Sequence, residues 1–282
     1  ERALALLGWL YDTLVRPAEV ELEGHRSVRF ELDGRLGPIP LGALRDARRQ
    51  RFLVESHAVS QQLVLGTVAG PVRPRRVPPA TLLAVGAGEV DEERYPDLAP
   101  LDHAKAEASA LQPLYPRTIV LTGENATLQA VLGQGGEAEV LHVAGHTLFN
   151  ERLVHPLGIP LAPDQGGGGD LLTAQELSRA RWPRLRVAVL ATCQSARGGG
   201  GVGGAWLDLA RPLLAGGAEA VVASTADLLD DRVTPVLLAF HRELATGTPA
   251  DEALRRAQLE ELGRRRDSSD LATWAPLVAL TR

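Results

Sequence analysis

The chain has 282 residues and a formal net charge of −5, with 45% hydrophobic and 23% charged residues. This composition is typical of a globular protein and excludes a disordered chain, a collagen and a disulfide-rich scaffold. The charge balance gives no basic footprint for nucleic acid, and no run of 18 apolar residues predicts a membrane span. We therefore expect no nucleic-acid partner, no membrane partner, and either one large α/β unit or two small domains.

Cys193 is the only cysteine of the sequence, and there is no methionine. A single cysteine forms no internal disulfide, which together with the absence of an opening signal peptide predicts a reducing, cytoplasmic location. The missing methionine leads us to expect a fragment or a processed product. Arginine outnumbers lysine, and alanine, glycine and leucine are abundant, which hints at a bacterial source.

The first 70 residues predict a mixture of helix and strand. Apolar side chains recur at helical spacing over residues 2–15, and residues 28–32 alternate like a strand before a turn at Asp33-Gly34. Residues 52–59 predict a further strand. The stretch 70–79 contains four prolines and three arginines without periodicity, so we place a boundary there. The expected units are an N-terminal α/β subdomain over 1–70 and a larger domain over 80–282.

From residue 81 onward, strand and helix patterns alternate along the chain. This order predicts a mostly parallel sheet with helices on both of its faces. The expected strands are 81–88, 118–123, 139–146, 185–193 and 218–225, and a short apolar segment at 275–280 closes the chain. The expected helices are 101–115, 126–134, 175–181, 206–215, 231–245 and 249–265.

Two of these strands end in side chains that can carry chemistry. Residues 139–146 end in His146, and residues 185–193 end in Cys193. Ligands of open parallel sheets bind beyond the carboxyl ends of the strands, where both residues are expected. The two are 47 residues apart, close to the interval of about 50 that separates the His and Cys of caspases.

A histidine beside a cysteine is the arrangement that nucleophilic catalysis by a thiol needs. A free thiol has a pKa of about 8.5, so little thiolate exists at neutral pH. A neighbouring imidazole lowers that pKa or accepts the proton during attack, and later protonates the leaving amine. The backbone N–H groups of Thr147 and Cys193 are the expected donors to the developing oxyanion.

Some of these residues and the glycine-rich stretch also have other interpretations. A lone cysteine is commonly a small core residue, but its place at a strand end favours function. His142 lies four residues before His146, and we expect a hydrogen-bonded core residue there, because no nearby ligand completes a metal set. The glycine-rich stretch 198–204 lacks the lysine and serine or threonine of a phosphate-binding loop. We therefore expect neither a metal nor a cofactor.

The motifs LHVAGH (141–146) and VLATCQSA (189–196) resemble the catalytic strands of the CHAT domain. This family is a bacterial relative of caspases and separases in the clan of His–Cys peptidases. Further resemblances follow in the family's order over nearly the whole chain. They are GRLGPIPLGALRD (34–46), RFLVESHAVSQQ (51–62), His155-Pro156-Leu157 with 171–177, residues 215–224, and Trp274-Ala275-Pro276-Leu277.

The resemblance implies a caspase-like three-layer sandwich with a mostly parallel sheet flanked by helices. Residues 80–282 would then be the catalytic domain, and residues 1–70 a subdomain that completes the CHAT region. His146 would be the general base and Cys193 the nucleophile of peptide-bond hydrolysis. Thr147 departs from the pattern, because the family usually has glycine after the histidine.

The segment after the expected strand 218–225 bears on substrate choice. It lacks the tryptophan of the family's pattern, which is replaced by Ala226, but its final acid matches at Asp230. In separase-like relatives an acid in this region receives a basic P1 side chain, so the resemblance implies Asp230, with Asp227, as substrate-binding candidates. The alternative is an acidic start to the helix expected over 231–245. Both interpretations stay open.

The sequence thus predicts a cysteine endopeptidase that cuts a protein substrate at few sites. CHAT domains are usually joined to regulatory or sensor modules, which implies such a module or partner here. The main alternative is a catalytically silent CHAT pseudo-protease that binds proteins. A Cys–His hydrolase or transferase that acts on small molecules is a further alternative.

Overall fold

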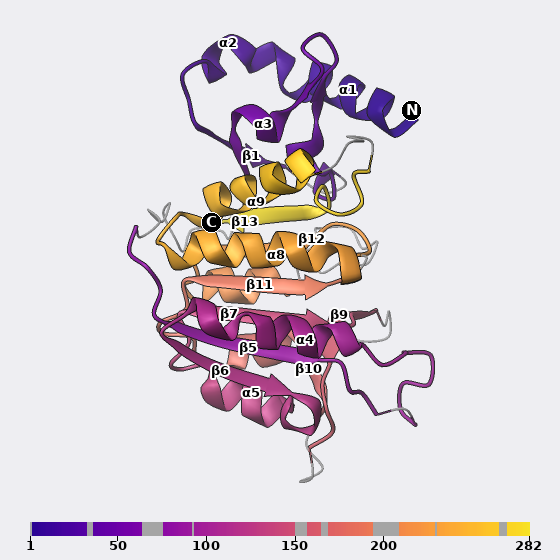
Figure 1. Cartoon of the computed structure of the whole chain (residues 1–282), viewed down its shortest axis with the longest axis vertical. Helices are drawn as coiled ribbons and strands as arrows, with labels where there is room; N and C mark the ends of the chain where they lie inside the picture. The colour runs from indigo at the N-terminus through magenta and orange to yellow at the C-terminus, as the bar shows by residue number, and fades with distance from the viewer. Residues whose placement is uncertain are drawn as a thin grey trace.

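A computed structural model describes the chain over residues 2–32, 36–63, 76–91, 93–149, 157–164, 169–193, 209–228, 230–264 and 270–282. The expected turn at Asp33-Gly34, the motif residues His155-Pro156 and the glycine-rich stretch 198–204 lie outside these ranges. The molecule is elongated, with the N-terminal elements at one end (Figure 1). Within the described ranges, no helix combines the length and apolar character needed to cross a membrane.

The central sheet is mostly parallel, as the alternation of strand and helix patterns predicts. Among the described residues, eight strands pair in the order β1-β4-β13-β12-β11-β7-β5-β6. Each neighbouring pair is parallel except β12 with β13. The strands are β1 (Ser27–Glu31), β4 (Ala58–Gln62), β5 (Thr81–Ala87), β6 (Arg117–Thr122), β7 (Val140–Gly145), β11 (Val187–Thr192), β12 (Ala220–Ser224) and β13 (Leu277–Thr281).

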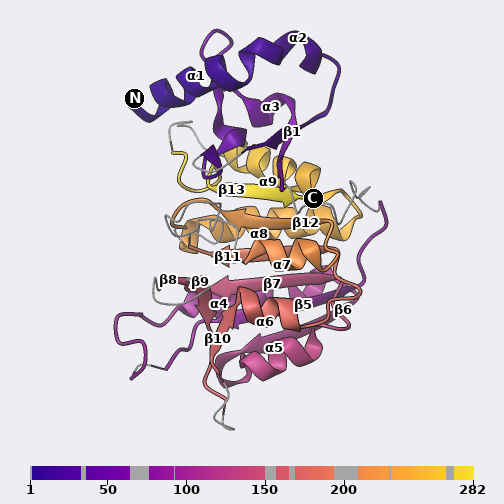
Figure 2. The same cartoon turned by 180° about the vertical axis from the view of Figure 1, so that it is seen from behind.

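Helices cover both faces of this sheet, and each face has its own core. One face, here called the α4–α8 face, packs against α4, α8 and α9, and the other packs against α5, α6 and α7 (Figures 1 and 2). Side chains along β7 alternate accordingly: Val140 and Ala144 join the first core, whereas Leu141 and Val143 join the second. Burial on both sides explains why the central strands are continuous apolar runs. The helices are α4 (Asp102–Ala110), α5 (Leu128–Gln134), α6 (Ala174–Arg179), α7 (Ala210–Ala215), α8 (Asp230–Ala245) and α9 (Ala250–Arg264).

The N-terminal residues belong to the same sheet through β1 and β4, which lie beyond β13. The expected helix is α1 (Arg2–Leu14), and the expected strand over residues 28–32 is β1. The division into units over 1–70 and 80–282 stays a prediction. The smaller elements here are α2 (Glu19–Leu22), the 3-10 turns Arg16–Ala18 and Leu41–Ala43, and the two-stranded pair β2 (Arg45–Asp46) and β3 (Arg51–Phe52).

The prediction of one strand over residues 52–59 is wrong. The chain instead ends β3 at Phe52, forms the helix α3 (Leu53–Ser56), and enters β4 at Ala58. The Glu55 carboxylate accepts a hydrogen bond from the Phe52 N–H at 2.6 Å, which closes the first turn. The turn buries two adjacent side chains, Leu53 and Val54, whereas a strand points neighbouring side chains to opposite faces.

A second sheet connects β7 to α6, and its three strands were not predicted. It contains β8 (Leu148–Phe149), β9 (Leu157–Pro160) and β10 (Leu171–Thr173), with β9 in the middle and both pairings antiparallel. At its centre Gly158 lies close to the Leu171 side chain, because a Cβ there would lie 2.6 Å from the Leu171 Cγ and would force that side chain to move. Since β8 begins three residues after β7 ends, this sheet adjoins the carboxyl edge of the central sheet.

Arg255 of α9 holds the short helix α3 in place, and its loss should destabilise the protein. Its guanidinium donates to the carbonyls of Val54 and Glu55, each at 2.9 Å. We expect Arg255→Met to lower the free energy of unfolding by about 2 kcal/mol, because two partly buried carbonyls lose a charged donor. Urea unfolding measures the change.

The neighbouring Arg256 supplies the control, because its side chain is 51% exposed and pairs only with surface carboxylates among the contacts described. We expect Arg256→Met to change the free energy of unfolding by at most about 1 kcal/mol. Equal losses in the two variants would contradict the anchoring role of Arg255.

Candidate active site

His146 and Cys193 follow the last residues of two adjacent parallel strands. Gly145 of β7 and Thr192 of β11 are register partners, and His146 and Cys193 are the next residue of each chain. Neighbouring strands lie about 4.8 Å apart. The topology therefore places the two backbones side by side at the carboxyl edge, where the sequence analysis expects a site.

The two side chains also share one face of the sheet. Ala144 and Ala191, two residues earlier in each strand, belong to the core of the α4–α8 face, and Cys193 packs against that core. Residues two apart along a strand point the same way. His146 and Cys193 thus both turn toward the segments that lead into α4 and α8.

His146 has a defined hydrogen-bond partner in the loop before α4. Its Nε2 lies 2.7 Å from the carbonyl oxygen of Ala99. A carbonyl oxygen only accepts, so Nε2 carries the proton, and in the neutral ring Nδ1 holds the free lone pair. In this tautomer Nδ1 is the ring nitrogen that can accept a hydrogen bond or a proton.

Cys193 is half-buried and forms no disulfide within the chain. Its Sγ lies 3.7 Å from the carbonyl oxygen of Leu228, a weak hydrogen bond from the thiol to the segment before α8. Leu228 itself is buried. The thiol is therefore partly accessible, as a reactive cysteine must be, while its hydrogen bond to a carbonyl stabilises the neutral form in the absence of substrate.

Thr147 joins the two strand ends through its side chain. Its hydroxyl donates to the Thr192 hydroxyl at 2.7 Å, and Thr192 is buried. This bond ties the residue after His146 to the residue before Cys193, on the face opposite the His146 and Cys193 side chains. The role of the Thr147 and Cys193 N–H groups as oxyanion donors stays a prediction.

Asp227 and Asp230 lie on the segment from β12 to α8. Asp227 is exposed and immediately precedes Leu228, whose carbonyl faces the thiol. Asp230 is the first residue of α8, and its side chain lies outside the described part of the structure. The segment that carries both acids therefore lies next to the Cys193 thiol at Leu228. A substrate-binding role of the two acids stays a prediction.

Toward the middle of the sheet from His146 and Cys193, a chain of hydrogen-bonded polar side chains runs through the core of the α4–α8 face. His142 Nε2 lies 2.9 Å from Glu107 Oε1, and His142 Nδ1 lies 3.1 Å from His241 Nε2. Tyr115 Oη lies 2.7 Å from His241 Nδ1, and the Thr234 hydroxyl donates to Glu107 at 2.5 Å. With Glu107 ionised and both rings neutral, every donor points toward Glu107, so the buried groups satisfy one another.

This network explains the expected role of His142 and shows what the sequence analysis missed. His142 is fully buried and hydrogen-bonded. Its acidic partner Glu107 comes from α4, and His241 comes from α8, 99 residues away in the chain. The alternation of β7 indicates which face His142 occupies, but nothing in the sequence pairs it with these residues. A small cavity lined by Glu107, Thr234, Ala144 and Ala191 separates the network from the strand ends.

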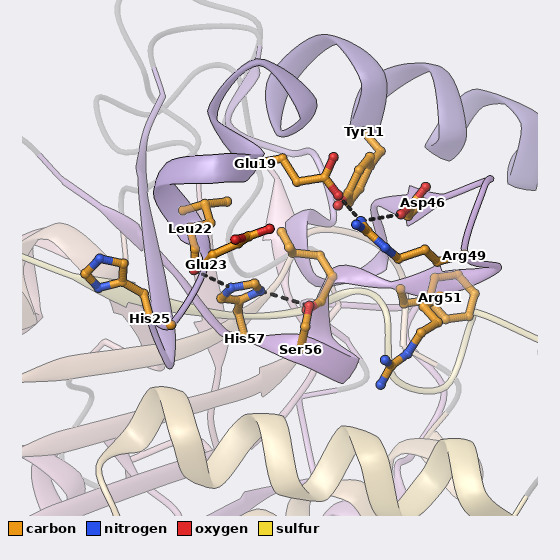
Figure 3. A pocket seen from close by; sticks show the side chains of 13 residues that line it. Tyr11, Glu19, Leu22, Glu23, His25, Asp46, Arg49, Arg51, Ser56 and His57 are labelled. Carbon is orange, nitrogen blue, oxygen red and sulfur yellow. Dashed lines mark hydrogen bonds and ion pairs between the residues drawn. The ribbon is translucent and has the colours of Figure 1, made fainter.

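A larger cavity of about 340 Å³ lies among the N-terminal elements, far from β7 and β11 (Figures 1 and 3). Figure 3 shows Arg49 between Glu19 and Asp46, with which it forms ion pairs. His57 contacts the Ser56 hydroxyl at 2.9 Å. None of the expected site residues lines this cavity, so it carries no part of the candidate chemistry.

A model of the CHAT domain matches residues 4–282, nearly the whole chain. The chain belongs to the CHAT-domain family. Among solved structures, gingipain R (RGPB) of Porphyromonas gingivalis, described as an Arg-specific cysteine proteinase, is 11% identical with a TM-score of 0.52 over 94% of this chain. Separase of Saccharomyces cerevisiae, solved in complex with securin, is 11% identical with a TM-score of 0.52 over 87% of this chain. No curated protein matches the sequence.

These likenesses show a caspase-like fold, as expected from the sequence. The CHAT domain described here spans 66% of the gingipain chain and 15% of the separase chain. Family and fold together support a cysteine peptidase, and the assignment of His146 and Cys193 as its catalytic residues stays a prediction.

The buried network of the CHAT domain should make its stability depend on pH. Burial, together with the neighbouring His142, lowers the pKa of His241 well below its ordinary value. Below pH of about 6.5 the unfolded chain binds a proton at this residue that the folded protein does not. The free energy of unfolding therefore falls with decreasing pH, by at most about 1.4 kcal/mol per pH unit from this residue.

Urea unfolding between pH 7.5 and 5 tests this dependence. We expect a shallower pH slope in His241→Asn than in the unaltered protein, whatever the absolute loss of stability. His25 is exposed, so His25→Asn should leave the slope unchanged. Identical slopes in all three proteins would contradict the assignment.

Proposed function

We propose that this CHAT domain is a cysteine endopeptidase in which Cys193 is the nucleophile and His146 the general base. The observation that carries the proposal is their placement after register partners of adjacent parallel strands. The Ala99 carbonyl on His146 Nε2 supports it further, because it leaves Nδ1 free to accept the thiol proton.

In the proposed reaction, His146 Nδ1 takes the proton of the Cys193 thiol as the sulfur attacks the scissile carbonyl carbon. The carbonyl electrons move to the oxygen, and we assign the N–H groups of Thr147 and Cys193 as its hydrogen-bond donors. The imidazolium then protonates the leaving amine, and the C–N bond breaks to give a thioester. Water, deprotonated by His146, attacks the thioester and releases the acid and the thiol.

We further propose a basic P1 residue in the substrate, received by Asp230 with Asp227 nearby. The path of the chain supports this, because the segment that carries both acids passes Cys193 at Leu228. A carboxylate at a pocket wall binds arginine or lysine by charge-assisted hydrogen bonds. The description of gingipain R as Arg-specific is in line with it.

The proposal also covers the substrate, the partner and the cellular location of the enzyme. We propose a protein substrate cut at few sites, and a regulatory or sensor module as partner. A bacterial cytoplasm agrees with the single free cysteine.

Reactivity of the single thiol tests the dyad without a substrate. At pH 6, we expect iodoacetamide to label Cys193 at least about tenfold faster in the unaltered protein than in His146→Ala, because the imidazole raises the thiolate fraction. Mass spectrometry of the intact chain measures the rate. Equally slow labelling of the two proteins would contradict the dyad and favour the protein-binding alternative.

Cleavage of a mixed peptide library tests the substrate class. We expect cleavage after arginine and lysine that is lost, by about 10³-fold or more, in Cys193→Ala. Asp230→Asn should reduce kcat/KM for these peptides by about 10- to 100-fold, as expected for a lost charged partner. The neighbouring Asp231→Asn is the matched control. Cleavage after other residues would keep the dyad and overturn the role of Asp230.

A further inference from the structure

The loop that carries Ala99, the hydrogen-bond partner of His146, has its first and last residues in contact with each other. It runs from Gly88, at the end of β5, to Leu101, before α4, and the Leu101 N–H donates to the Gly88 carbonyl at 3.1 Å. A Cβ at Gly88 would collide with the Leu101 carbonyl oxygen. Glycine is therefore required for this closure, which fixes the base of the loop.

The described residues between Gly88 and Leu101 lie outside both hydrophobic cores. Between Gly88 and Leu101, every described residue is exposed or half-buried. The position of Ala99 therefore depends on polar contacts, which are directional and few.

Asp170 provides these contacts from outside the loop. Its Oδ1 accepts a hydrogen bond from the Tyr95 hydroxyl at 3.1 Å and pairs with Arg94 at 2.8 Å. The Asp170 side chain is only 3% exposed, a costly placement for a carboxylate unless such partners stabilise it. Burial and the nearby Asp170 raise the pKa of Tyr95 to about 12, so its hydroxyl remains a donor.

The second sheet fixes Asp170 relative to His146. Asp170 directly precedes β10, and its carbonyl accepts from the Leu161 N–H at 2.7 Å. In the same sheet, β8 begins two residues after His146. One small sheet therefore holds both the backbone that follows His146 and the carboxylate that anchors the loop of Ala99.

We propose that Asp170 and Tyr95 are positioning residues for His146, which hold the Ala99 carbonyl against its Nε2. The inference rests on the proposed role of His146 as the base of the dyad. When the loop is anchored, the carbonyl keeps Nδ1 unprotonated in the neutral ring and stabilises the imidazolium formed with the thiolate. When the anchor is lost, the imidazolium loses that acceptor, and less thiolate forms at low pH.

The test is the pH profile of iodoacetamide labelling of Cys193, measured on the whole chain without substrate. At pH 6 we expect labelling about tenfold slower in Asp170→Asn and about threefold slower in Tyr95→Phe than in the unaltered protein. At pH 9, where the thiol ionises without help, the three rates should agree within twofold. A general loss of structure would not produce a difference confined to low pH.

Glu219→Gln is the matched control. Glu219 is also a buried carboxylate paired with an arginine, Arg186 at 3.2 Å, but it precedes β12 at the opposite edge of the sheet. Its labelling profile should match that of the unaltered protein.

The outcomes separate the two proposals. Fast labelling at pH 6 that depends on His146 but is unchanged in Asp170→Asn and Tyr95→Phe would overturn the positioning role and leave the dyad standing. Changes equal at pH 6 and pH 9, or shared by Glu219→Gln, would also overturn it. Slow labelling of the unaltered protein, equal to that of His146→Ala, would overturn the dyad and this inference together.

Discussion

The parallel ladder between β7 and β11 is the constraint on which the site depends. Hydrogen bonds along the ladder set Gly145 opposite Thr192. The backbone of the next residue in each chain, His146 or Cys193, is therefore also held in place. Because both strands are buried on both faces, a slip of register by one residue would turn every side chain to the wrong core. The packing of the whole sheet thus protects the juxtaposition of His146 and Cys193.

His146 and Cys193, the proposed dyad, have different surroundings toward the middle of the sheet and beyond the strand ends. Below the dyad, toward the middle of the sheet, Glu107, His142 and His241 lie within the core of the α4–α8 face and hydrogen-bond to one another. On the outer side, no described residue between Gly88 and Leu101 belongs to a hydrophobic core, and this loop, which reaches His146, depends on Asp170 and on the closure at Gly88. The rigid part of the site is therefore set by packing, and its outer part by a few polar contacts.

A local prediction fails where a tertiary contact decides the outcome. The apolar residues Leu53 and Val54 favour a strand over 52–59, yet residues 53–56 form a helical turn, and Arg255 of α9 donates to the Val54 and Glu55 carbonyls. The second sheet was missed for a related reason, since strands of two to four residues leave almost no periodic signal. Its importance lies in what it connects: the backbone after His146 and the anchor Asp170.

The sequence by itself determined the α/β class, the mostly parallel sheet and the strand ends at His146 and Cys193. Continuous apolar runs and helical spacing are local patterns that burial on both faces imposes on the chain. Only the tertiary structure decided the strand order and the partners of each polar group. Ala99 meets His146, Glu107 and His241 meet His142, and Tyr95 meets Asp170 across 35 to 99 residues of chain. Such contacts depend on how elements pack, and a single sequence carries no local pattern for them.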